Sequence, residues 1–316
     1  MKDVYRELCE NELSIPLFSQ AWWLDAVAGD AWNVVLATKG KQVVGALPYV
    51  IRKRWGFSLL TQPALTQALG PWVRPSQKSY PKFLAYEKDV LGELADQLPA
   101  HDYYAQNWHC ERTNWLPFFW RGCVQTTRYT YRLPLHEGQD QVWKGLQENT
   151  RREIRKARDR FDVSVRAGGL DEFLALNRLT FERQGRIVPY TNEFVARIDS
   201  AASSRSARDC LVAVDGEGRL HAGAYILRSG NTAYYLMGGG DPELRNSGAT
   251  SLVLWEAICR QPGTIEIFDF EGSMIEPIER FFRAFGAVQT PYFHVSRYRS
   301  KLLRLLDTLR SIRSWE

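Results

Sequence analysis

Two stretches of the chain share one alternation of apolar runs and turns. Residues 34–50 read VVLATKGKQVVGALPYV, and residues 211–227 read LVAVDGEGRLHAGAYIL. In each stretch an apolar run reaches a glycine-containing turn and a second apolar run follows, a pattern that predicts a β-hairpin. Both second strands carry Gly-Ala at the same point, at Gly45 and Gly223. The match indicates that one supersecondary unit occurs twice.

A second pair of matching segments ends each copy. Residues 118–126 read FFWRGCVQT, and residues 281–290 read FFRAFGAVQT. Because both matches occur in the same order, we interpret the chain as an internal duplication. Each copy reads as helix, hairpin, strand, helix, strand, helix and strand, which predicts an α/β fold with a mixed sheet. With 316 residues, the chain is also long enough for two hydrophobic cores.

The duplication predicts an N-terminal domain over residues 1–136 and a C-terminal domain over residues 163–298. Residues 137–162 are expected to form a basic linker helix, in which apolar residues recur at helical spacing beside many arginines. One interpretation is a solvated connecting helix whose charges are partly balanced by its own carboxylates. The other is a helix that contacts phosphate or tRNA, which a net charge of +5 also favours.

Composition excludes several classes of protein. Hydrophobic residues make up 45% and charged residues 24% of the chain, as in ordinary globular proteins. The five cysteines are scattered without any C-x-x-C pair, so neither a disulfide scaffold nor a zinc site is expected. We expect a cytoplasmic protein, since the first residues resemble no signal peptide and no run of 18 apolar residues occurs. Eight of the 11 tryptophans precede residue 121, which predicts a tryptophan-rich core or, alternatively, an aromatic-lined groove.

These segments resemble a known family. The hairpins with Gly-Ala, FDF-x-G at residues 268–272 and FF-x-x-FGA at 281–287 resemble the GNAT (N-acetyltransferase) fold. Two such units joined by the basic TRREIRKA segment at 150–157 resemble the Fem-type peptidyl or aminoacyltransferases, over residues 17–298. The resemblance implies two tandem GNAT-like domains, each with a mixed sheet flanked by helices. It also implies transfer of an acyl or aminoacyl group to an amine, with acyl-CoA or aminoacyl-tRNA as co-substrate and no tightly bound cofactor. The chain lacks the long helical hairpin that some Fem-type enzymes insert in their second domain.

The segment TAYYLMGGGDPELRNSGATSLVLWEAI, residues 232–258, is the predicted donor site. It reads as a strand to Met237, a glycine-rich loop and a helix that begins near Ala249. Such a helix N-terminus favours phosphate, although a glycine-rich connection without a ligand has a similar sequence. In GNAT enzymes a loop of the form Q/R-x-x-G-x-G/A holds the pyrophosphate of coenzyme A; Arg245 and Gly248 agree with it, and Thr250 departs from it. The predicted cofactor-binding residues are Gly238, Gly239, Asp241, Arg245, Ser247, Gly248 and Ala249.

The first copy has no such glycine motif in the corresponding stretch, LTQALGPWVRPSQKSYP. We therefore expect the donor site in the second copy, and we expect the first copy to shape the acceptor groove.

Predicted catalytic residues follow on the next strand, residues 264–270. Asp269 and Glu271 share one face there, and a buried carboxylate with a raised pKa can accept the proton of an attacking amine. A structural role in bonding backbone is the alternative for each. By analogy with some GNAT enzymes, Tyr235 is a candidate to protonate the leaving group, with core packing as the alternative. No Ser-His-Asp order or metal-ligand cluster stands out, which agrees with direct attack by the amine.

The following helix carries two candidate substrate ligands. Arg280 and Arg283 are predicted to bind an anionic substrate, although surface pairing with Glu276 or Glu279 has equal weight. Ser273 and Glu276 have the spacing of a capping box that starts this helix.

Residues 299–316 are predicted to form a basic amphipathic helix with leucines on one side. This helix either packs on its own protein or lies on an anionic membrane, which would make the protein membrane-peripheral.

Three functions remain open from the sequence. The first is Fem-like transfer to an amine of a cell-wall precursor or related peptide, with tRNA as a partner. The second is acyl-CoA-dependent N-acylation of a small amine. The third is a non-catalytic module that binds nucleic acid or membrane, since a fold does not fix a function.

Overall fold

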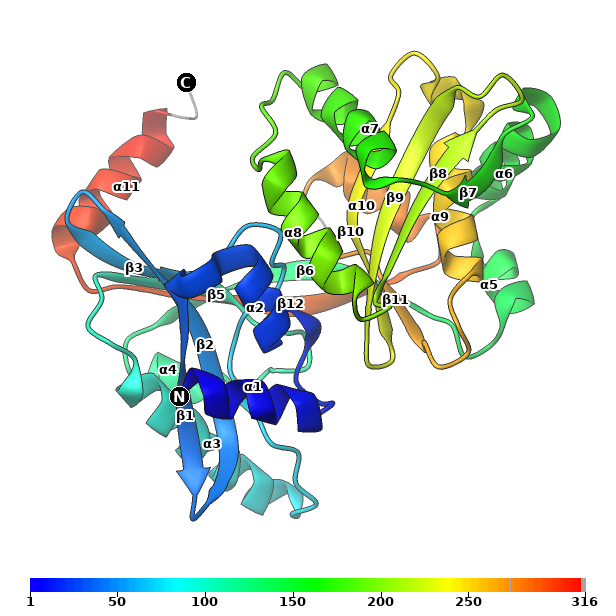
Figure 1. The fold of residues 1–316 in the computed structure, drawn as a ribbon. Helices are drawn as coiled ribbons and strands as arrows, with labels where there is room; N and C mark the ends of the chain where they lie inside the picture. Colours follow the sequence, from blue (N-terminus) through cyan, green and yellow to red (C-terminus); the bar gives the residue numbers. More distant parts are fainter. Residues whose placement is uncertain (273, 314–316) are drawn as a thin grey trace. The chain divides into compact units, whose positions relative to one another are not determined.

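The structure, a computed structural model, describes residues 1–272 and 274–313, with side chains as far as residue 309 (Figure 1). The chain forms two compact units. Unit 1 comprises Met1–Arg128 together with Pro291–Glu316, and unit 2 comprises Tyr129–Thr290. No helix in the described part of the chain combines the length and apolarity needed to cross a bilayer.

Unit 1 contains a mixed sheet in the order β1-β2-β3-β5-β12, in which β3 and β5 are parallel and the other neighbours antiparallel. The short strand β4 pairs with β2. The strands are β1 (Trp32–Lys39), β2 (Gln42–Arg54), β3 (Phe57–Thr61), β4 (Trp72–Val73), β5 (Tyr103–Asn107) and β12 (Val288–Tyr298). The helices are α1 (Lys2–Asn11), α2 (Ala21–Ala28), α3 (Tyr80–Gln97), α4 (Leu116–Phe119) and α11 (Lys301–Arg313).

The core of unit 1 lies between its sheet and α3. The predicted tryptophan-rich core is confirmed, because four of the early tryptophans are almost fully buried: Trp23, Trp32, Trp72 and Trp108. Trp55 and Trp120 differ, with 54% and 59% of their surface exposed. The first repeated glycine, Gly45, lets α3 approach β2, since a Cβ there would lie 2.3 Å from Val90 Cγ1.

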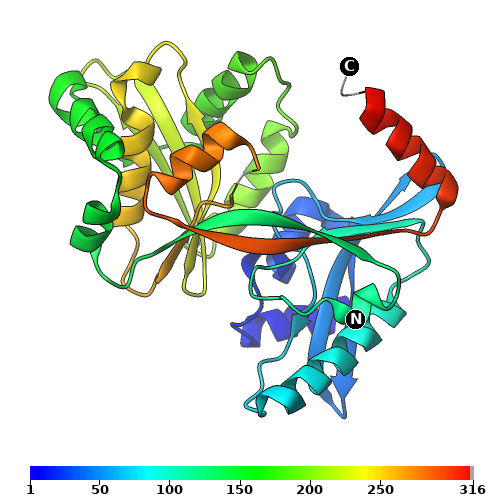
Figure 2. The same ribbon diagram turned by 180° about the vertical axis from the view of Figure 1, so that it is seen from behind.

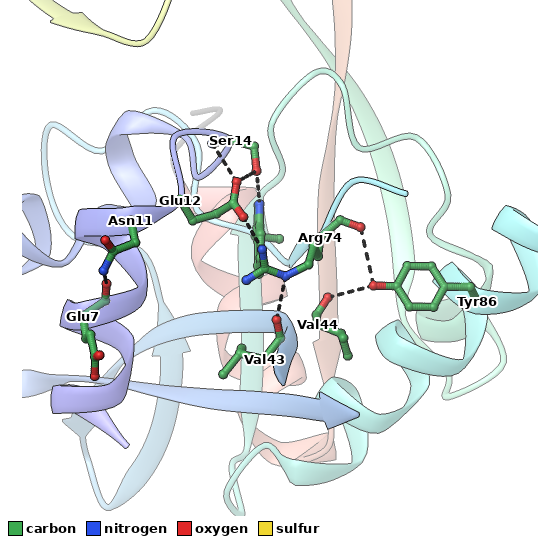
Figure 3. Close-up of polar contacts among 9 residues, drawn as sticks. Glu7, Asn11, Glu12, Ser14, Val43, Val44, Arg74 and Tyr86 are labelled. Carbon is green, nitrogen blue, oxygen red and sulfur yellow. Dashed lines mark hydrogen bonds and ion pairs between the residues drawn. The ribbon is translucent and has the colours of Figure 1, made fainter. Parts of the chain in front are cut away.

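A half-buried ion pair ties the segment after α1 to β2 (Figure 3). Arg74 donates from Nη1 to Glu12 Oε2 at 2.5 Å and from Nε to the Val43 carbonyl at 2.9 Å. The hydroxyl of Ser14 donates to the second carboxylate oxygen of Glu12 at 2.7 Å. These bonds hold residues 12–14 against the hairpin that the sequence pattern predicts.

Unit 2 contains a mixed sheet in the order β6-β11-β10-β9-β8-β7, in which β10 and β11 are parallel. The strands are β6 (Val124–Pro134), β7 (Ser164–Ala167), β8 (Arg208–Val214), β9 (Leu220–Ser229), β10 (Thr232–Gly240) and β11 (Ile267–Asp269). The helices are α5 (Gln139–Gly145), α6 (Glu148–Phe161), α7 (Leu170–Arg183), α8 (Asn192–Ser203), α9 (Ala249–Cys259) and α10 (Glu276–Arg283). Helix α7 packs on β9 and β10, whereas α9 packs on β8 and β9.

The basic segment predicted as one helix over residues 137–162 forms two helices inside unit 2, α5 and α6. The helix is interrupted at Leu146, which has an extended backbone conformation. The N–H of the next residue, Gln147, donates to the carbonyl of Ala284 at 2.9 Å. Leu146, Ile154 and Ala157 are buried as their spacing predicts, and α6 lies beside α9 (Figure 2). The helix is therefore part of the core of unit 2.

The compact units do not coincide with the duplicated stretches of sequence, because strand pairing divides the chain differently. Residues 132–134 of β6, which close the first copy, pair with β11 in unit 2. Residues 294–298 of β12, which close the second copy, pair with β5 in unit 1. Each unit is thus completed by a strand that the sequence attaches to the other copy.

The repeated Phe-Phe and Gly landmark forms the same turn twice. Gly122 follows α4 and Gly286 follows α10, and each has a φ of 80°. Glycine adopts this left-handed conformation at little cost, unlike residues with a Cβ atom. The turn directs the chain into β6 in one copy and into β12 in the other.

A glycine on β10 sets how closely α7 can pack. A Cβ at Gly239 would lie 2.5 Å from the backbone nitrogen of Asn177 and 2.6 Å from the carbonyl carbon of Leu176. We expect Gly239→Ala to destabilise unit 2 by roughly 1–3 kcal/mol, because the α7 backbone must move away from the sheet. The shift of the urea unfolding midpoint measures this effect.

Gly263→Ala is the matched control for that substitution, because nothing lies within 4 Å of a Cβ at Gly263. Equal midpoints for the two variants would show that α7 does not need glycine at position 239.

Candidate functional site

The sheet of unit 2 opens between β10 and β11. These strands pair in parallel over three residues, ending at Tyr234 opposite Asp269. Strand β10 continues to Gly240 beside β9, and its register shifts between Tyr235 and Met237. From Tyr235 onward, the edge of β10 that faced β11 therefore has no strand partner in the described part of the chain.

The prediction that Gly238 and Gly239 lie in a loop is wrong, because both lie within β10. Both glycines lie in the strand because neighbouring groups pack closely against β10 at these two positions. The hydroxyl of Tyr235 occupies the space where a Cβ of Gly238 would lie, and the α7 backbone contacts Gly239. Asn177 Nδ2 donates to the Gly238 carbonyl at 2.7 Å, so α7 also satisfies this part of the strand.

The predicted phosphate loop forms a short 3-10 turn over Arg245–Ser247 that leads into α9. Arg245 is exposed and forms no ion pair with a described residue. Asp241 has a local role: its N–H donates to the His221 carbonyl and its Oδ1 accepts from the N–H of Glu243. Arg245 is thus the residue of this loop whose charge is available to an anion.

Gly248 is the N-cap of α9, with a φ of 83°. A Cβ at this position would lie 2.2 Å from the carbonyl oxygen of Glu153 in α6. Helix α6 therefore packs closely against the turn before α9. The sequence pattern did not predict this contact. In the first turn of α9, the N–H of Ala249 donates to Ser247 Oγ at 3.3 Å, and the N–H of Thr250 has no acceptor among the described residues.

A buried chain of side chains supports this turn from β8 and β9. Asp215 Oδ2 lies 2.9 Å from His221 Nε2, and His221 Nδ1 lies 2.9 Å from Ser247 Oγ. The order Asp-His-Ser resembles a hydrolase triad, but Ser247 is only 2% exposed. We assign these three side chains a positioning role, since Ser247 Oγ is bonded to His221 Nδ1 and also accepts the N–H of Ala249 at the start of α9. The sequence does not predict this Asp215–His221–Ser247 arrangement, because no common motif links the three residues.

The carboxylate of Asp269 holds the turn that follows β11. Its Oδ1 accepts from the hydroxyl of Thr130 at 2.5 Å and from the N–H of Glu271 at 2.8 Å. Its Oδ2 lies 3.7 Å from Arg132 Nε. Burial raises the pKa of this carboxyl, while Thr130, the backbone and Arg132 oppose the rise. Asp269 thus has the hydrogen-bonded surroundings of a structural residue.

Glu271 has a different environment. Its φ is 58°, an unfavourable value for a side chain that carries a Cβ, and its Oε1 is enclosed. Burial first, and the negative charge of Asp269 second, raise the pKa of its carboxyl well above the ordinary value. A strained residue with a raised pKa at the end of a strand is typical of a functional carboxyl.

Tyr235 lies on the other side of the opening, one residue beyond the last pair with β11. Its ring packs edge-on against Phe282, which also stacks on Phe270 and contacts Phe281. Burial raises the pKa of its hydroxyl, so the phenol keeps its proton at neutral pH. Tyr235 and Glu271 therefore lie one and two residues beyond the last paired residues of β10 and β11.

The two candidate substrate arginines on α10 differ. Arg283 Nε lies 2.9 Å from Glu279 Oε1, which also accepts from Tyr131, so its charge is paired. Arg280 is exposed and has no ion pair within the described residues. The predicted capping box is wrong, because α10 begins at Glu276 with Ile275 as its N-cap; Ser273 itself lies outside the described residues.

Much of the positive charge on α6 is compensated. Arg151 and Arg155 both pair with Glu148, and Arg158 pairs with Glu256. Arg152 instead donates to the neutral side-chain oxygen of Asn149 at 2.7 Å. The described residues contain no group of three or more potential metal ligands.

Unit 2 thus combines a strand with a register shift, a parallel neighbour that ends early and a helix that is entered through glycine, a combination that resembles the GNAT fold. Residues 144–274 match the family model described as acetyltransferase (GNAT) domain. A comparison with curated protein sequences gives no match.

Solved structures with the same fold cover nearly the whole chain. The crystal structure of FemX superposes with a TM-score of 0.65 at 12% identity, over 93% of this chain and 95% of that one. A tandem GNAT protein from the clavulanic acid biosynthesis pathway gives a TM-score of 0.56 at 13% identity, over 95% and 94% of the chains. L-PGS from Bacillus licheniformis gives 0.56 at 9% identity, over 96% and 95%. The predicted tandem GNAT-like α/β fold and the predicted Fem-type resemblance are both confirmed at the level of the fold.

Gly248 offers a direct test of the turn before α9. We expect Gly248→Ala to lower stability by at least about 1–2 kcal/mol, the cost of a left-handed residue with a Cβ, with a further loss from the clash with Glu153. Urea unfolding measures the loss.

Gly218→Ala separates the two causes. Gly218 has a similar φ of 80° but nothing within 4 Å of its Cβ position. If both variants lose the same stability, contact between α6 and Gly248 contributes nothing.

Proposed function

We propose that unit 2 transfers an acyl or aminoacyl group from an activated, phosphate-bearing carrier to an amine. The observation that carries this proposal is the opening beyond Tyr234 and Asp269, with the start of α9 after its glycine-containing turn and an enclosed carboxyl at its ends. The fold alone is that of an acyltransferase; the transferred group and the acceptor belong to the proposal.

The donor carrier would bind at the start of α9. The N–H of Thr250 and the positive end of an 11-residue helix favour phosphate there. The guanidinium of Arg245 would add a charge-assisted contact. Ser247, Gly248 and Ala249 would set the path of the backbone, with Asp215 and His221 behind them. Gly238 and Gly239 would contribute indirectly, by allowing Tyr235 and α7 to pack closely against β10.

In the transfer step, the amine nitrogen attacks the donor carbonyl carbon and a new C–N bond forms. The proton released from the amine passes to the carboxylate of Glu271, and the bond between the acyl carbon and the carrier breaks. The hydroxyl of Tyr235 gives its proton to the departing carrier atom. Asp269 acts through the backbone of Glu271, and Arg280 would attract an anionic group of the acceptor.

Two carriers fit this site. An aminoacyl-tRNA, and hence a Fem-like reaction on a cell-wall precursor or related peptide, is supported by the basic helix α6 beside the turn at Gly248. Acyl-CoA, and hence acylation of a smaller amine, is supported by Arg245 and Gly248 in the spacing of a pyrophosphate loop.

Coenzyme A distinguishes these carriers. If it binds, a concentration 100 times its dissociation constant stabilises the protein by about 2.7 kcal/mol, which raises the melting temperature by roughly 5–10 °C. A thermal melt with and without coenzyme A measures the rise. Arg245→Gln should remove most of it.

Without a shift, tRNA binding that weakens steeply with salt would assign the aminoacyl carrier. If neither ligand binds, a carrier site at α9 is excluded.

Glu271→Gln tests the proposed base. We expect kcat to fall by roughly 10²–10⁴, because the amine loses its proton acceptor, with little change in donor affinity. In the wild type, kcat/KM should rise with pH through the raised pKa of Glu271, and this limb should vanish in the variant. The exposed Glu266→Gln is the matched control. Wild-type turnover in Glu271→Gln would remove this residue from the mechanism.

The same substitution has a pH-dependent effect on stability that fixes the protonation state. Because the pKa of Glu271 is raised in the folded state, the unfolded chain binds fewer protons between the two pKa values. The contribution of the Glu271 carboxyl to folding stability is fully present below its unfolded pKa of about 4.3, and it is lost as pH rises through its folded pKa. Glu271→Gln should therefore show a smaller loss of stability between acidic and neutral pH than the wild type.

A further inference from the structure

Unit 1 contains a cavity of about 530 Å³ whose lining includes none of the residues assigned to the candidate site of unit 2. It is bounded by the end of α3, the start of β5, α4 and the end of β12. Arg121, Arg297 and Arg299 line it together with His101 and Cys123. A cavity of this volume is within the range of small-molecule sites.

The charges on the cavity wall do not cancel. Arg121 is neutralised by Asp96, to which it donates from Nε at 2.6 Å and from Nη2 at 2.5 Å. Arg297 and Arg299 have no carboxylate partner among the described residues. Arg297 lies at the end of β12 and Arg299 one residue beyond it, and both line the cavity. The cavity thus has two uncompensated guanidinium groups.

The two other titratable groups add no charge. Burial raises the pKa of the Cys123 thiol to about 11, although the three arginines oppose the rise. Burial also lowers the pKa of His101, and the charges of Arg299 and Arg297 lower it further. Both groups are therefore neutral at neutral pH, and the net charge of the wall stays near +2.

The Arg297 side chain lies against the turn after α4. Its Nε would lie 3.5 Å from a Cβ at Gly122, so the guanidinium lies directly over the backbone of this left-handed glycine. The equivalent glycine of the second copy, Gly286, has instead the carbonyl of Gly145 at 2.9 Å from its Cβ position. The arginine arrangement is thus a feature of unit 1 that the duplication did not repeat.

One exposed aromatic side chain is part of the cavity wall. Trp120 lines the cavity and is 59% exposed. On the same short stretch, Leu116, Phe119 and Val124 are also about half or more exposed. A ligand with its anionic group at Arg297 and Arg299 would therefore meet an apolar surface at Trp120.

We propose that this cavity binds a phosphate ester. Two guanidinium groups match the charge of a phosphate in number and in their bidentate geometry. The volume exceeds that of a phosphate group, so the site accommodates part of the attached alcohol as well. The ester belongs either to a membrane lipid headgroup or to a soluble phosphorylated molecule. The proposal does not rest on the acyl transfer assigned to unit 2.

Two probes distinguish the sources. Glycerol 3-phosphate, at constant ionic strength, represents the soluble ester and is followed by thermal melting and calorimetry. Vesicles of phosphatidylglycerol in phosphatidylcholine represent the lipid and are followed by co-sedimentation, with pure phosphatidylcholine vesicles as the reference. We expect at least one probe to bind the wild-type protein.

The variant Arg297→Gln/Arg299→Gln should weaken that binding at least about tenfold, as expected when charge-assisted bonds to phosphate are lost. Lys39→Gln/Lys41→Gln is the matched control, since it removes the same charge from exposed positions of unit 1 and should bind as the wild type does. The exposed single variant Arg299→Gln serves if the double variant does not fold.

Binding of glycerol 3-phosphate that depends on the two arginines assigns a soluble ester. Arginine-dependent binding to phosphatidylglycerol vesicles alone assigns a lipid headgroup. The proposal is overturned if neither probe binds, or if the arginine and lysine variants bind equally well.

Discussion

The parallel pairing of β10 with β11 stops at Tyr234 and Asp269, and a buried carboxylate sets the place where it stops. Asp269 accepts the N–H of Glu271, so the chain turns away from β10 into a left-handed conformation instead of extending the ladder. A buried N–H without an acceptor would cost roughly 1–3 kcal/mol, which makes this bond a condition for the turn. The turn is further confined by β6, because a Cβ at Gly272 would lie 2.1 Å from the Tyr129 carbonyl oxygen. The free edge of β10 and the position of Glu271 both follow from this geometry.

The second half of the site depends on packing around α9. Gly248 allows α6 to contact the turn before the helix, and the Asp215–His221–Ser247 chain supports that turn from the sheet. The two supports come from separate parts of unit 2 in sequence, residue 153 and residues 215–221. Together they fix the start of α9 without using the N–H of Thr250, which remains available to an anion.

Local patterns predicted much of the fold. Apolar alternation located the hairpins, and the left-handed glycines at 122 and 286 confirmed the repeated landmark. The pattern did not predict that β12 pairs with β5, because the choice of partner depends on backbone hydrogen bonds between residues almost 190 positions apart. Gly238 and Gly239 looked like a loop because glycine is common in turns, whereas the structure needs them for the close approach of α7.

The sequence indicated the candidate carboxylates but not their division of roles. Asp269 and Glu271 are equivalent in the strand pattern, and only the positions of Thr130 and Arg132 on β6 make one structural and leave the other as the candidate base. The arginine cavity of unit 1 could not be predicted for the same reason, since residue 121 is far in sequence from residues 297 and 299. Contacts of long sequence separation are therefore the information that periodicity and motifs lack.

We propose above that the acyl donor binds in the opening between β10 and β11 of unit 2. Hydrogen–deuterium exchange tests it most directly, with peptides that cover residues 235–250 followed in the presence of coenzyme A thioester or aminoacyl-tRNA. We expect one of these donors to slow the exchange of backbone amides in residues 235–250, including the amide of Thr250. Unchanged exchange with both donors, or protection confined to unit 1, would contradict it.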